Sequence, residues 1–227
     1  MSTSPTAATQ HVEPVENPLA LARSLAPLRE FVATTTRIVE QPQSEAHCVE
    51  AVRGALARLI SNDAWLPASA AQPHPEHYQQ YLLHCDPLQR FSVVSFVWGP
   101  GQRTPVHDHM VWGLIGMLRG SETGQNFKRD ENGKLIPDGP RQTLSPGDIE
   151  MVSPRTGDIH QVANAYDDRT SISIHVYGGN IGAVARHVFD LESGAVKPFV
   201  SGYSSAQTPN LWDLSHIVRA ELPKEPA

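Results

Sequence analysis

Apolar residues recur at helical spacing in the first part of the chain. Between residues 17 and 62 they return every three or four positions, which places them on one face of an α-helix. The Asn17-Pro18 pair is typical of a helix start, and Pro27 is expected to break or kink this first helix. The Ser44-Glu45 pair begins a second helix. The apolar positions are Leu19, Leu21, Leu25, Leu28, Phe31, Val32 and Ile38, then Val49, Val52, Leu56, Leu59 and Ile60.

From residue 78 the pattern changes to short runs rich in β-branched and aromatic residues. Such runs predict β-strands, and clusters of Gly, Pro, Asn and Asp between them predict turns. Many short strands at regular spacing favour a sandwich or a barrel, so we expect a mainly β fold with N-terminal α-helices. The expected strands are 81–83, 91–98, 104–109, 111–119, 123–129, 141–144, 148–152, 159–164, 170–177, 184–189 and 196–200.

The remaining segments add no second domain. Residues 1–16 are small and polar and contain proline, which predicts a disordered tail. Residues 17–227 are then expected to form one domain, because neither an internal repeat nor an interdomain linker divides them. Its expected parts are a helical region over 17–62, a β-barrel over about 78–200 and a C-terminal arm over 201–227.

Composition narrows the class of protein. The 227 residues carry a formal net charge of −6, which argues against a nucleic acid or an anionic membrane as partner. No apolar run is long enough to span a bilayer, and the N-terminus lacks the basic and apolar regions of a secretion signal. Cys48 and Cys85 are the only cysteines and make no disulfide framework. We therefore expect a reduced, cytoplasmic setting.

A His-x-His pair at His107 and His109 is the first candidate for chemistry. On an extended strand, side chains alternate with a period of two, so both imidazoles would project from one face. Such pairs also arise by chance, and the neighbouring residues make this one more specific. Gly101 precedes the pair, and Gly113 and Gly120 follow it, at the spacing of the first cupin motif.

A later segment supplies a third histidine, His160. Its residues follow the order of the second cupin motif, with slightly longer spacing. They are Gly147, Asp148, Pro154, Gly157, His160 and Asn164. The two half-motifs together predict a mononuclear metal site made by His107, His109 and His160. They also imply a cupin double-stranded β-helix, a jelly-roll barrel, in agreement with the expected strands.

Gly113 stands where the first cupin motif usually has a glutamate. Without it, three neutral imidazoles leave the full double charge on the ion, which suits an anionic incoming ligand such as a thiolate. The common iron site of O₂-using enzymes has two histidines and one carboxylate, whereas zinc binds three histidines equally well. Residue types alone therefore leave iron and zinc open.

A second set of polar residues lies in the run Ser171–Tyr177. Period two puts Ser173, His175 and Tyr177 on one face of a strand and the apolar residues between them on the other. A hydrogen-bonded Ser-His-Tyr chain can hold a phenol in place and tune its acidity. An ordinary half-buried strand with its polar residues towards solvent would show the same pattern.

Together these segments resemble the thiol dioxygenases, the cysteine dioxygenase family of cupins. The resemblance covers roughly residues 78–200, and the whole set is specific although no single piece is. It is carried by Phe96–Gly101, Val106–His109, Gly113, Leu118–Gly120, Ser173, His175 and Tyr177.

The resemblance implies a chemistry for these residues. It implies ferrous iron and the oxidation of a small thiol by O₂ to its sulfinate. The implied iron ligands are His107, His109 and His160. Tyr177, oriented by His175 and Ser173, would hydrogen-bond to the bound substrate or to the reacting oxygen.

Two departures from the animal and cysteine-specific enzymes bear on the substrate. Gly113 stands where animal cysteine dioxygenases have a cysteine that cross-links to the active-site tyrosine, so no cross-link can form. Gln80 stands where an arginine clamps the carboxylate of cysteine, and glutamine here resembles the bacterial 3-mercaptopropionate dioxygenases. In that subgroup a later arginine takes part in holding the carboxylate, and Arg186 is the candidate. Both residues also suit ordinary strand positions.

We therefore expect a non-haem iron dioxygenase whose partners are O₂ and a small thiol bearing a carboxylate, 3-mercaptopropionate first. Cysteine and mercaptosuccinate are alternative substrates. A metal-dependent isomerase and a dioxygenase acting on carbon are alternative functions, but they give the Ser-His-Tyr set no role. A non-catalytic binding module is a third alternative, and it predicts no oxygen uptake with any thiol. The sequence does not determine the oligomeric state.

Overall fold

The computed structural model describes residues 24–205, 219, 220 and 222. The predicted tail over 1–16, the helix start at Asn17-Pro18 and most of the predicted C-terminal arm lie outside these residues. The described part begins with two α-helices and continues into two antiparallel β-sheets. The predicted mainly β fold, a double-stranded β-helix with N-terminal helices, is confirmed.

The elements follow one another in a simple order. The helices are α2 (Ala26–Glu40) and α3 (Glu45–Ile60), with single turns of 3₁₀-helix at η1 (Ala68–Ala70) and η2 (Ile181–Ala183). The strands are β1 (Gln79–Cys85), β2 (Ser92–Trp98), β3 (Val106–His107), β4 (Gly113–Arg119), β5 (Glu122–Arg129), β6 (Leu135–Pro137), β7 (Gln142–Leu144), β8 (Ile149–Val152), β9 (Ile159–Asn164), β10 (Ser171–Tyr177), β11 (Arg186–Phe189) and β12 (Val196–Phe199).

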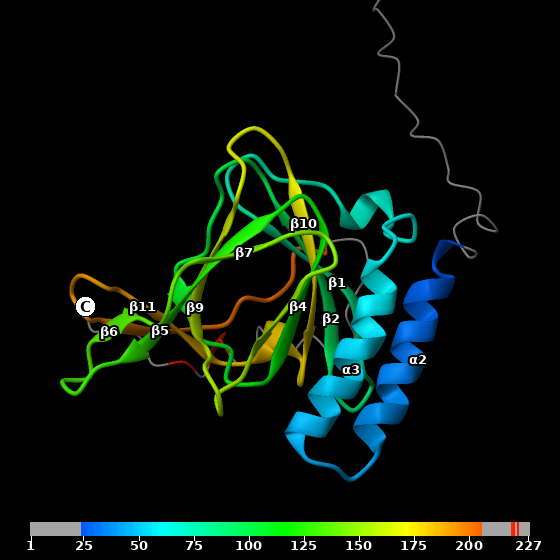
Figure 1. The fold of residues 1–227 in the computed structure, drawn as a ribbon, viewed down its shortest axis with the longest axis horizontal. Coiled ribbons are helices and arrows are strands. Elements are labelled where there is room, and N and C mark those ends of the chain that lie inside the picture. The colour runs from blue at the N-terminus through cyan, green and yellow to red at the C-terminus, as the bar shows by residue number, and fades with distance from the viewer. Residues whose placement is uncertain (1–23, 206–218, 221, 223–227) are drawn as a thin grey trace, which may run out of the picture.

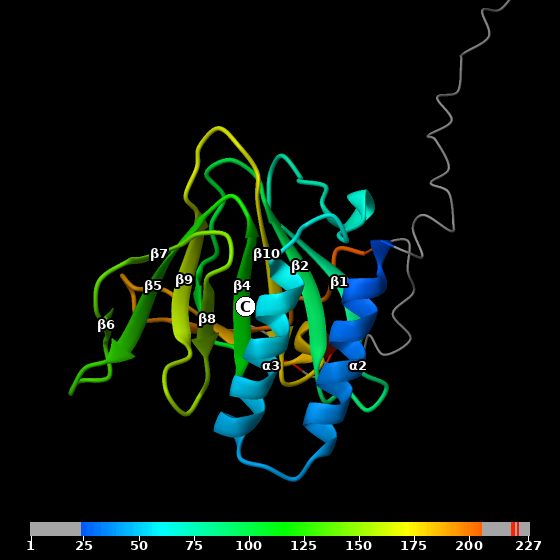
Figure 2. The same ribbon diagram turned by 45° about the vertical axis from the view of Figure 1, so that its right-hand side comes forward.

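Helix α3 starts where its sequence predicts, and α2 starts next to the predicted break at Pro27. Pro27 lies in the first turn of α2, where its missing N–H costs no helical hydrogen bond, so the predicted break falls just before α2. The Ser44 side chain accepts a hydrogen bond from the backbone N–H of His47 and caps α3. Both helices lie side by side against one face of the sheet that holds β1, β2 and β4 (Figures 1 and 2).

The two sheets differ in size and in their covering. A five-stranded sheet has the order β1-β2-β10-β4-β8, and a seven-stranded sheet has the order β12-β11-β3-β9-β5-β6, with β7 paired to β5. The helices cover only the five-stranded sheet, as Figure 2 shows. The other face of that sheet therefore turns towards the interior between the sheets, where polar side chains can gather.

Strand β10 shows this division most clearly. Ile172, Ile174 and Val176 belong to the apolar cluster that includes the helices. Tyr177, from the alternate set, belongs to a separate cluster on the inner face. The predicted alternation along this strand is confirmed, but both faces are buried, so the polar set does not face solvent.

One predicted strand is shorter in the structure, and one observed strand was not predicted. The strand expected over 104–109 is only Val106–His107, because Pro105 lacks an N–H and the chain turns at Met110, whose φ is 61°. His109 therefore lies in the loop after β3 and not on the strand itself. The short strand β6 was not predicted, because its three residues lie among turn residues and show no alternation.

Among the described residues, no helix has both the length and the apolar character that a bilayer crossing demands.

Packing of α3 on the sheet is expected to dominate local stability. Leu56 is fully buried, and its side chain fills the space left open by Gly116 of β4. We expect Leu56→Ala to lower the free energy of unfolding by about 3 kcal/mol, through lost transfer energy and an unfilled cavity. Denaturant unfolding followed by circular dichroism measures this. Leu88→Ala, at a side chain that is 72% exposed, is the control and is expected to change little.

Candidate metal centre

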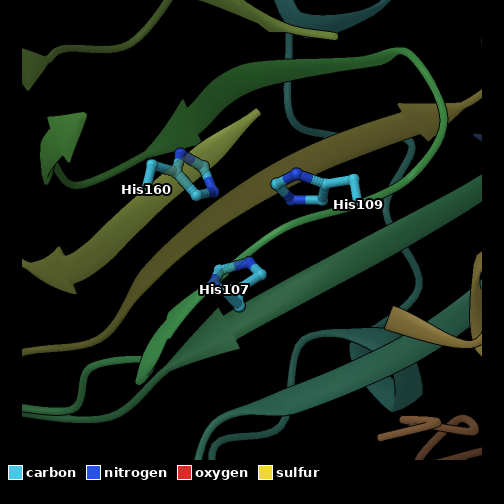
Figure 3. Close-up of side chains that lie close together, drawn as sticks. All are labelled: His107, His109 and His160. Carbon is cyan, nitrogen blue, oxygen red and sulfur yellow. The ribbon is translucent and has the colours of Figure 1, made fainter. Parts of the chain in front are cut away.

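Three imidazoles converge between the two sheets. His107 ends β3, His160 lies opposite it on the neighbouring strand β9, and His109 approaches from the loop after β3. Their ring centroids lie 4.8–4.9 Å apart, and one nitrogen of each ring lies within 4.8 Å of those of the other two. Figure 3 shows the three rings pointing towards a common centre. The structure thus brings together the three histidines predicted as ligands.

Hydrogen bonds from outside the cluster orient two of the rings. The Nδ1 atom of His109 lies 2.9 Å from the carboxylate of Asp158, which also accepts the backbone N–H groups of His109 and Met110. The Nδ1 atom of His107 lies 3.1 Å from the carbonyl oxygen of Pro105. In both rings the proton is then held on Nδ1, which leaves the Nε2 lone pair for a metal ion.

Burial keeps the three rings uncharged. It lowers the pKa of His107 and His160 well below the usual value, and positive charge on neighbouring histidines lowers both further. Burial also lowers the pKa of His109, although Asp158 acts against it. Only the neutral imidazole has a lone pair to donate, so the three rings are prepared as ligands at neutral pH.

The donor set fits a divalent ion held by three nitrogens. His160 has a buried Nδ1 without a hydrogen-bond partner among the described residues, and no carboxylate stands in the cluster. Three neutral ligands leave the charge of the ion uncompensated and leave further positions for other ligands. The arrangement therefore suits a catalytic metal site better than a closed structural one.

The Ser-His-Tyr set forms a continuous hydrogen-bonded chain. The Oγ atom of Ser173 lies 2.8 Å from Nε2 of His175, and Nδ1 of His175 lies 2.7 Å from the hydroxyl of Tyr177. The indole N–H of Trp98 donates to Ser173 at 3.2 Å. Phe96 stacks on the His175 ring with centroids 3.9 Å apart, so the ring has little freedom to move.

Tyr177 ends this chain beside the histidine cluster. Its ring stacks on His109 with centroids 5.5 Å apart. Gly113 lies opposite it on β4, and a Cβ there would come within 2.9 Å of two Tyr177 ring carbons. A side chain at position 113 would therefore meet this phenol. Burial raises the pKa of Tyr177 well above its ordinary value, although Arg186 lowers it, so the phenol keeps its proton.

Arg186 is buried, which excludes the alternative of a surface strand residue. Only 4% of it is exposed, its Nη2 donates to Ser201 at 2.7 Å, and the guanidinium lies 4.6 Å from the ring centroid of Phe199. Val188, two residues later, pairs with His107, so Arg186 lies on the face of the sheet that carries His107. The charge of Arg186 lowers the pKa of the Tyr78 and Tyr177 phenols. Its Nε has no partner among the described residues.

Gln80 lies on the inner face of β1. Its neighbours two positions away, Tyr78 and Leu82, pack in the same cluster as Tyr177, and side chains two apart share a face. Gln80 pairs with Phe96 of β2, another member of that cluster. It is partly buried, and hydrogen bonds of its backbone with Ser204 hold this edge.

Two acidic residues near the centre were not predicted to act there. Asp158 lies two residues before His160, so on a regular strand both side chains would project from the same face. This spacing is the feature of the sequence from which its role near the centre could be predicted. Asp108 points away from the cluster, as its position between the ligands predicts, and its carboxylate accepts the backbone N–H of His187 at 2.7 Å and contacts the His187 ring at 2.8 Å. This contact fixes β11, and so Arg186, beside β3.

A second group with metal-binding residue types lies at the surface. His74, Glu76 and His77 stand close together on the loop before β1, and the last two are exposed. Nδ1 of His74 already accepts the backbone N–H of Glu76. This group lacks the burial and the oriented rings of the interior cluster.

Comparison with known proteins gives a family and several likenesses of fold. The family model for cysteine dioxygenase type I matches residues 18–188. A cupin superfamily protein from Desulfitobacterium hafniense is 16% identical, with a TM-score of 0.39 over 51% of this chain and 90% of that one. A double-stranded β-helix protein from Klebsiella pneumoniae is 19% identical, with a TM-score of 0.41 over 52% and 87%. Oxalate oxidase bound to glycolate is 17% identical, with a TM-score of 0.40 over 51% and 59%. The three likenesses say nothing of activity.

The carboxylate of Asp158 is expected to support metal binding through His109. We expect Asp158→Asn to weaken metal affinity by about 10- to 100-fold, because the amide no longer holds the proton on Nδ1 with a charged acceptor. Competition with a chromophoric chelator measures the affinity. Asp138→Asn, in an exposed ion pair with Lys128, is the matched control. Equal affinities in the two variants would remove Asp158 from the site.

Proposed function

Because the chain belongs to the cysteine dioxygenase type I family, we propose that it is a non-haem iron dioxygenase that oxidises 3-mercaptopropionate to its sulfinate. The observation that carries this proposal is the position of the buried guanidinium of Arg186. It is buried on the face of β11 that carries His107 across the pair with β3, and its charge lowers the pKa of His107 and of the Tyr177 phenol. A small molecule with a thiol at one end and a carboxylate at the other matches this arrangement.

In this proposal His107, His109 and His160 hold ferrous iron. When bound, the iron supplies the activation of O₂ and of the sulfur. Both atoms of O₂ end on the sulfur, so thiol plus O₂ gives sulfinic acid and no external reductant is consumed. The protein contributes proximity, orientation and charge placement around that reaction.

Arg186 supplies the charge that binds the carboxylate. A guanidinium is positive at any ordinary pH, and a carboxylate that meets its buried face forms a charge-assisted hydrogen bond. The unpartnered Nε of Arg186 is a donor available for such a bond. Ser201 and Phe199 hold the rest of the group, so a substrate need not order it.

The side chains around Arg186 favour a substrate without an ammonium group. Gln80 is uncharged, and Asp108, the carboxylate whose charge acts on Arg186, already contacts His187. Asp158 contacts His109. An α-ammonium group would therefore find no free acidic partner beside the guanidinium. This favours 3-mercaptopropionate over cysteine as the substrate. Cysteine dioxygenase activity is the second candidate function.

In this proposal Tyr177 hydrogen-bonds to the reacting end of the substrate. The phenol keeps its proton because burial raises its pKa. His175 fixes the hydroxyl at 2.7 Å, and the ring rests on His109. The hydroxyl thus has a defined position before any substrate arrives, which lowers the cost of orientation in the reaction.

Oxygen uptake by iron-loaded protein tests the proposal. We compare 3-mercaptopropionate, cysteine and cysteamine, and expect the first to give the highest kcat/KM. Arg186→Lys should lower kcat/KM for 3-mercaptopropionate by about 10-fold or more, because an ammonium does not reproduce the fork of a guanidinium. Cysteamine has no carboxylate, so the kcat/KM for cysteamine should not change in this variant. Arg129→Lys, outside the site, is the control.

The other possible outcomes would each contradict one part of the proposal: the substrate, the activity or the metal. Fastest turnover of cysteine would assign the protein as a cysteine dioxygenase. No uptake with any thiol would leave a binding module or another cupin enzyme. Zinc at full occupancy in active protein would overturn the assignment of iron.

Removal of the phenol hydroxyl tests the role of Tyr177. We expect Tyr177→Phe to bind iron normally and to lose kcat by on the order of 100-fold, because the positioned hydrogen bond is absent. Metal analysis and oxygen uptake on the same preparation separate the two effects. Unchanged turnover would take the tyrosine out of the mechanism.

A further inference from the structure

Glu122 is a buried carboxyl group to which the proposed reaction gives no role. Only 1% of it is exposed, and neither carboxyl oxygen has a hydrogen-bond partner among the described residues. It begins β5, where its neighbours in the sheet are Asn164 on β9 and Leu144 on β7. Neither neighbour is charged. A buried carboxyl group without a hydrogen-bond partner lowers the stability of the fold, so its presence requires a structural or functional explanation.

The turn between β4 and β5 brings Glu122 to the Ser-His-Tyr chain. Gly120 has a φ of 80°, and a Cβ there would lie 2.3 Å from Oγ of Ser171 on β10. Only glycine allows this approach. The backbone N–H of Ser121 then donates to Ser171 at 3.0 Å.

The next residue, Glu122, pairs with Asn164, whose side-chain oxygen accepts a hydrogen bond from Oγ of Ser171 at 2.8 Å. Ser171 and Ser173 share one face of β10, so the carboxyl lies on the side of the barrel that holds Ser173 and Trp98. These two groups favour the ionised carboxylate, although neither forms a hydrogen bond of good geometry with it.

The hydrogen-bonded chain can run in either of two directions. A neutral imidazole has one nitrogen that donates and one that accepts, so the tautomer of His175 decides what its two partners do. Ser173 already accepts a hydrogen bond from the N–H of Trp98, which leaves it fewer positions for hydrogen bonds with other partners. The hydroxyl proton of Ser173 points either to His175 or away from it, in which case the Glu122 carboxylate is the acceptor that we consider.

We propose that Glu122 is a positioning residue that sets the direction of this chain, and so decides whether Tyr177 offers the site a donor or an acceptor. With Glu122 ionised, Ser173 donates to the carboxylate, Nε2–H of His175 donates to Ser173, and Tyr177 donates to Nδ1. The phenol oxygen then faces the site only as an acceptor. With Glu122 protonated, Ser173 donates to Nε2, Nδ1–H donates to Tyr177, and the phenol O–H is free for the site.

The change of state falls at neutral pH. Burial is the main cause that raises the pKa of Glu122 to about 7; the carboxylate of Glu150 on β8 acts in the same direction, and Ser173 and the Trp98 N–H act against it. Below that pH the carboxyl is protonated and Tyr177 is a donor. Above it the carboxylate is ionised and Tyr177 is an acceptor. The negative charge of Glu122 also raises the pKa of Tyr177, so the phenol stays protonated in both states.

The tautomer of His175 is the direct test, and it does not depend on any turnover. ¹⁵N spectra of full-length, histidine-labelled protein are recorded across neutral pH, both metal-free and loaded with diamagnetic Zn²⁺. His175→Gln identifies the signal by its loss. In the wild type we expect the ring proton to move from Nδ1 to Nε2 as the pH rises.

Two carboxyl variants make the test specific. Glu122→Gln has the same shape and cannot ionise, so its His175 tautomer should not change with pH. Glu150→Gln should keep the change and move its midpoint to lower pH, because a neighbouring negative charge is gone. A single tautomer at all pH values in the wild type, or a wild-type midpoint in Glu122→Gln, would overturn the inference.

The effect on turnover rests on the function proposed above, and it is measured separately. If the donor state of Tyr177 is the active one, kcat of the wild type falls about tenfold one pH unit above the midpoint, and Glu122→Gln shows no such fall. A pH-dependent fall that is equal in both proteins would exclude Glu122 as its source. Absence of all dioxygenase activity would contradict the proposed function, but it would not affect the result of the tautomer test.

Discussion

Three imidazoles can share a dry interior only if none of them is charged. Burial and mutual repulsion lower the pKa of His107 and His160, and the centre of the molecule depends on that neutrality. A neutral ring must place its single proton somewhere, and the carboxylate of Asp158 and the carbonyl of Pro105 decide this for two of the rings. Burial removes the charge, and the flanking acceptors direct the lone pairs inward.

The two sheets contribute different residues to the site. The seven-stranded sheet carries His107, His160 and Arg186, whereas the five-stranded sheet carries Gln80 and Tyr177. The helices cover the outer face of the five-stranded sheet, and that face packs mainly apolar side chains. Its inner face is then free to hold polar groups opposite the histidines. One strand, β10, contributes both to the core and to the site because its side chains alternate.

Charge inside the barrel is unevenly distributed. Arg186 is a buried cation beside the metal centre, and its direct hydrogen bond is to the hydroxyl of Ser201, which is neutral. Glu122 is a buried carboxyl at the far end of the Ser-His-Tyr chain, next to Ser173. The chain therefore links an acidic end to a site that attracts anions. A pH-dependent direction of the chain follows from this placement, since Tyr177 lies between the two.

Local pattern determined much of this protein. Alternation along β10, the cap at Ser44 and the motif spacing of the three histidines follow from rules that act over a few residues, and the structure agrees with each. Such rules depend on strand and helix periodicity, which is set by backbone sterics. They also predicted a sandwich or barrel with N-terminal helices, and the resemblance to the cupin motifs specified the jelly roll.

Tertiary structure alone decided the rest. Asp158 is 49 residues from His109, and Asp108 is 79 residues from His187, so these contacts depend on how strands meet and not on any local pattern. The inward orientation of Arg186 and the approach of Glu122 to Ser173 have the same origin. Periodicity gives a side chain its face, but only pairing between distant strands gives that face its neighbours.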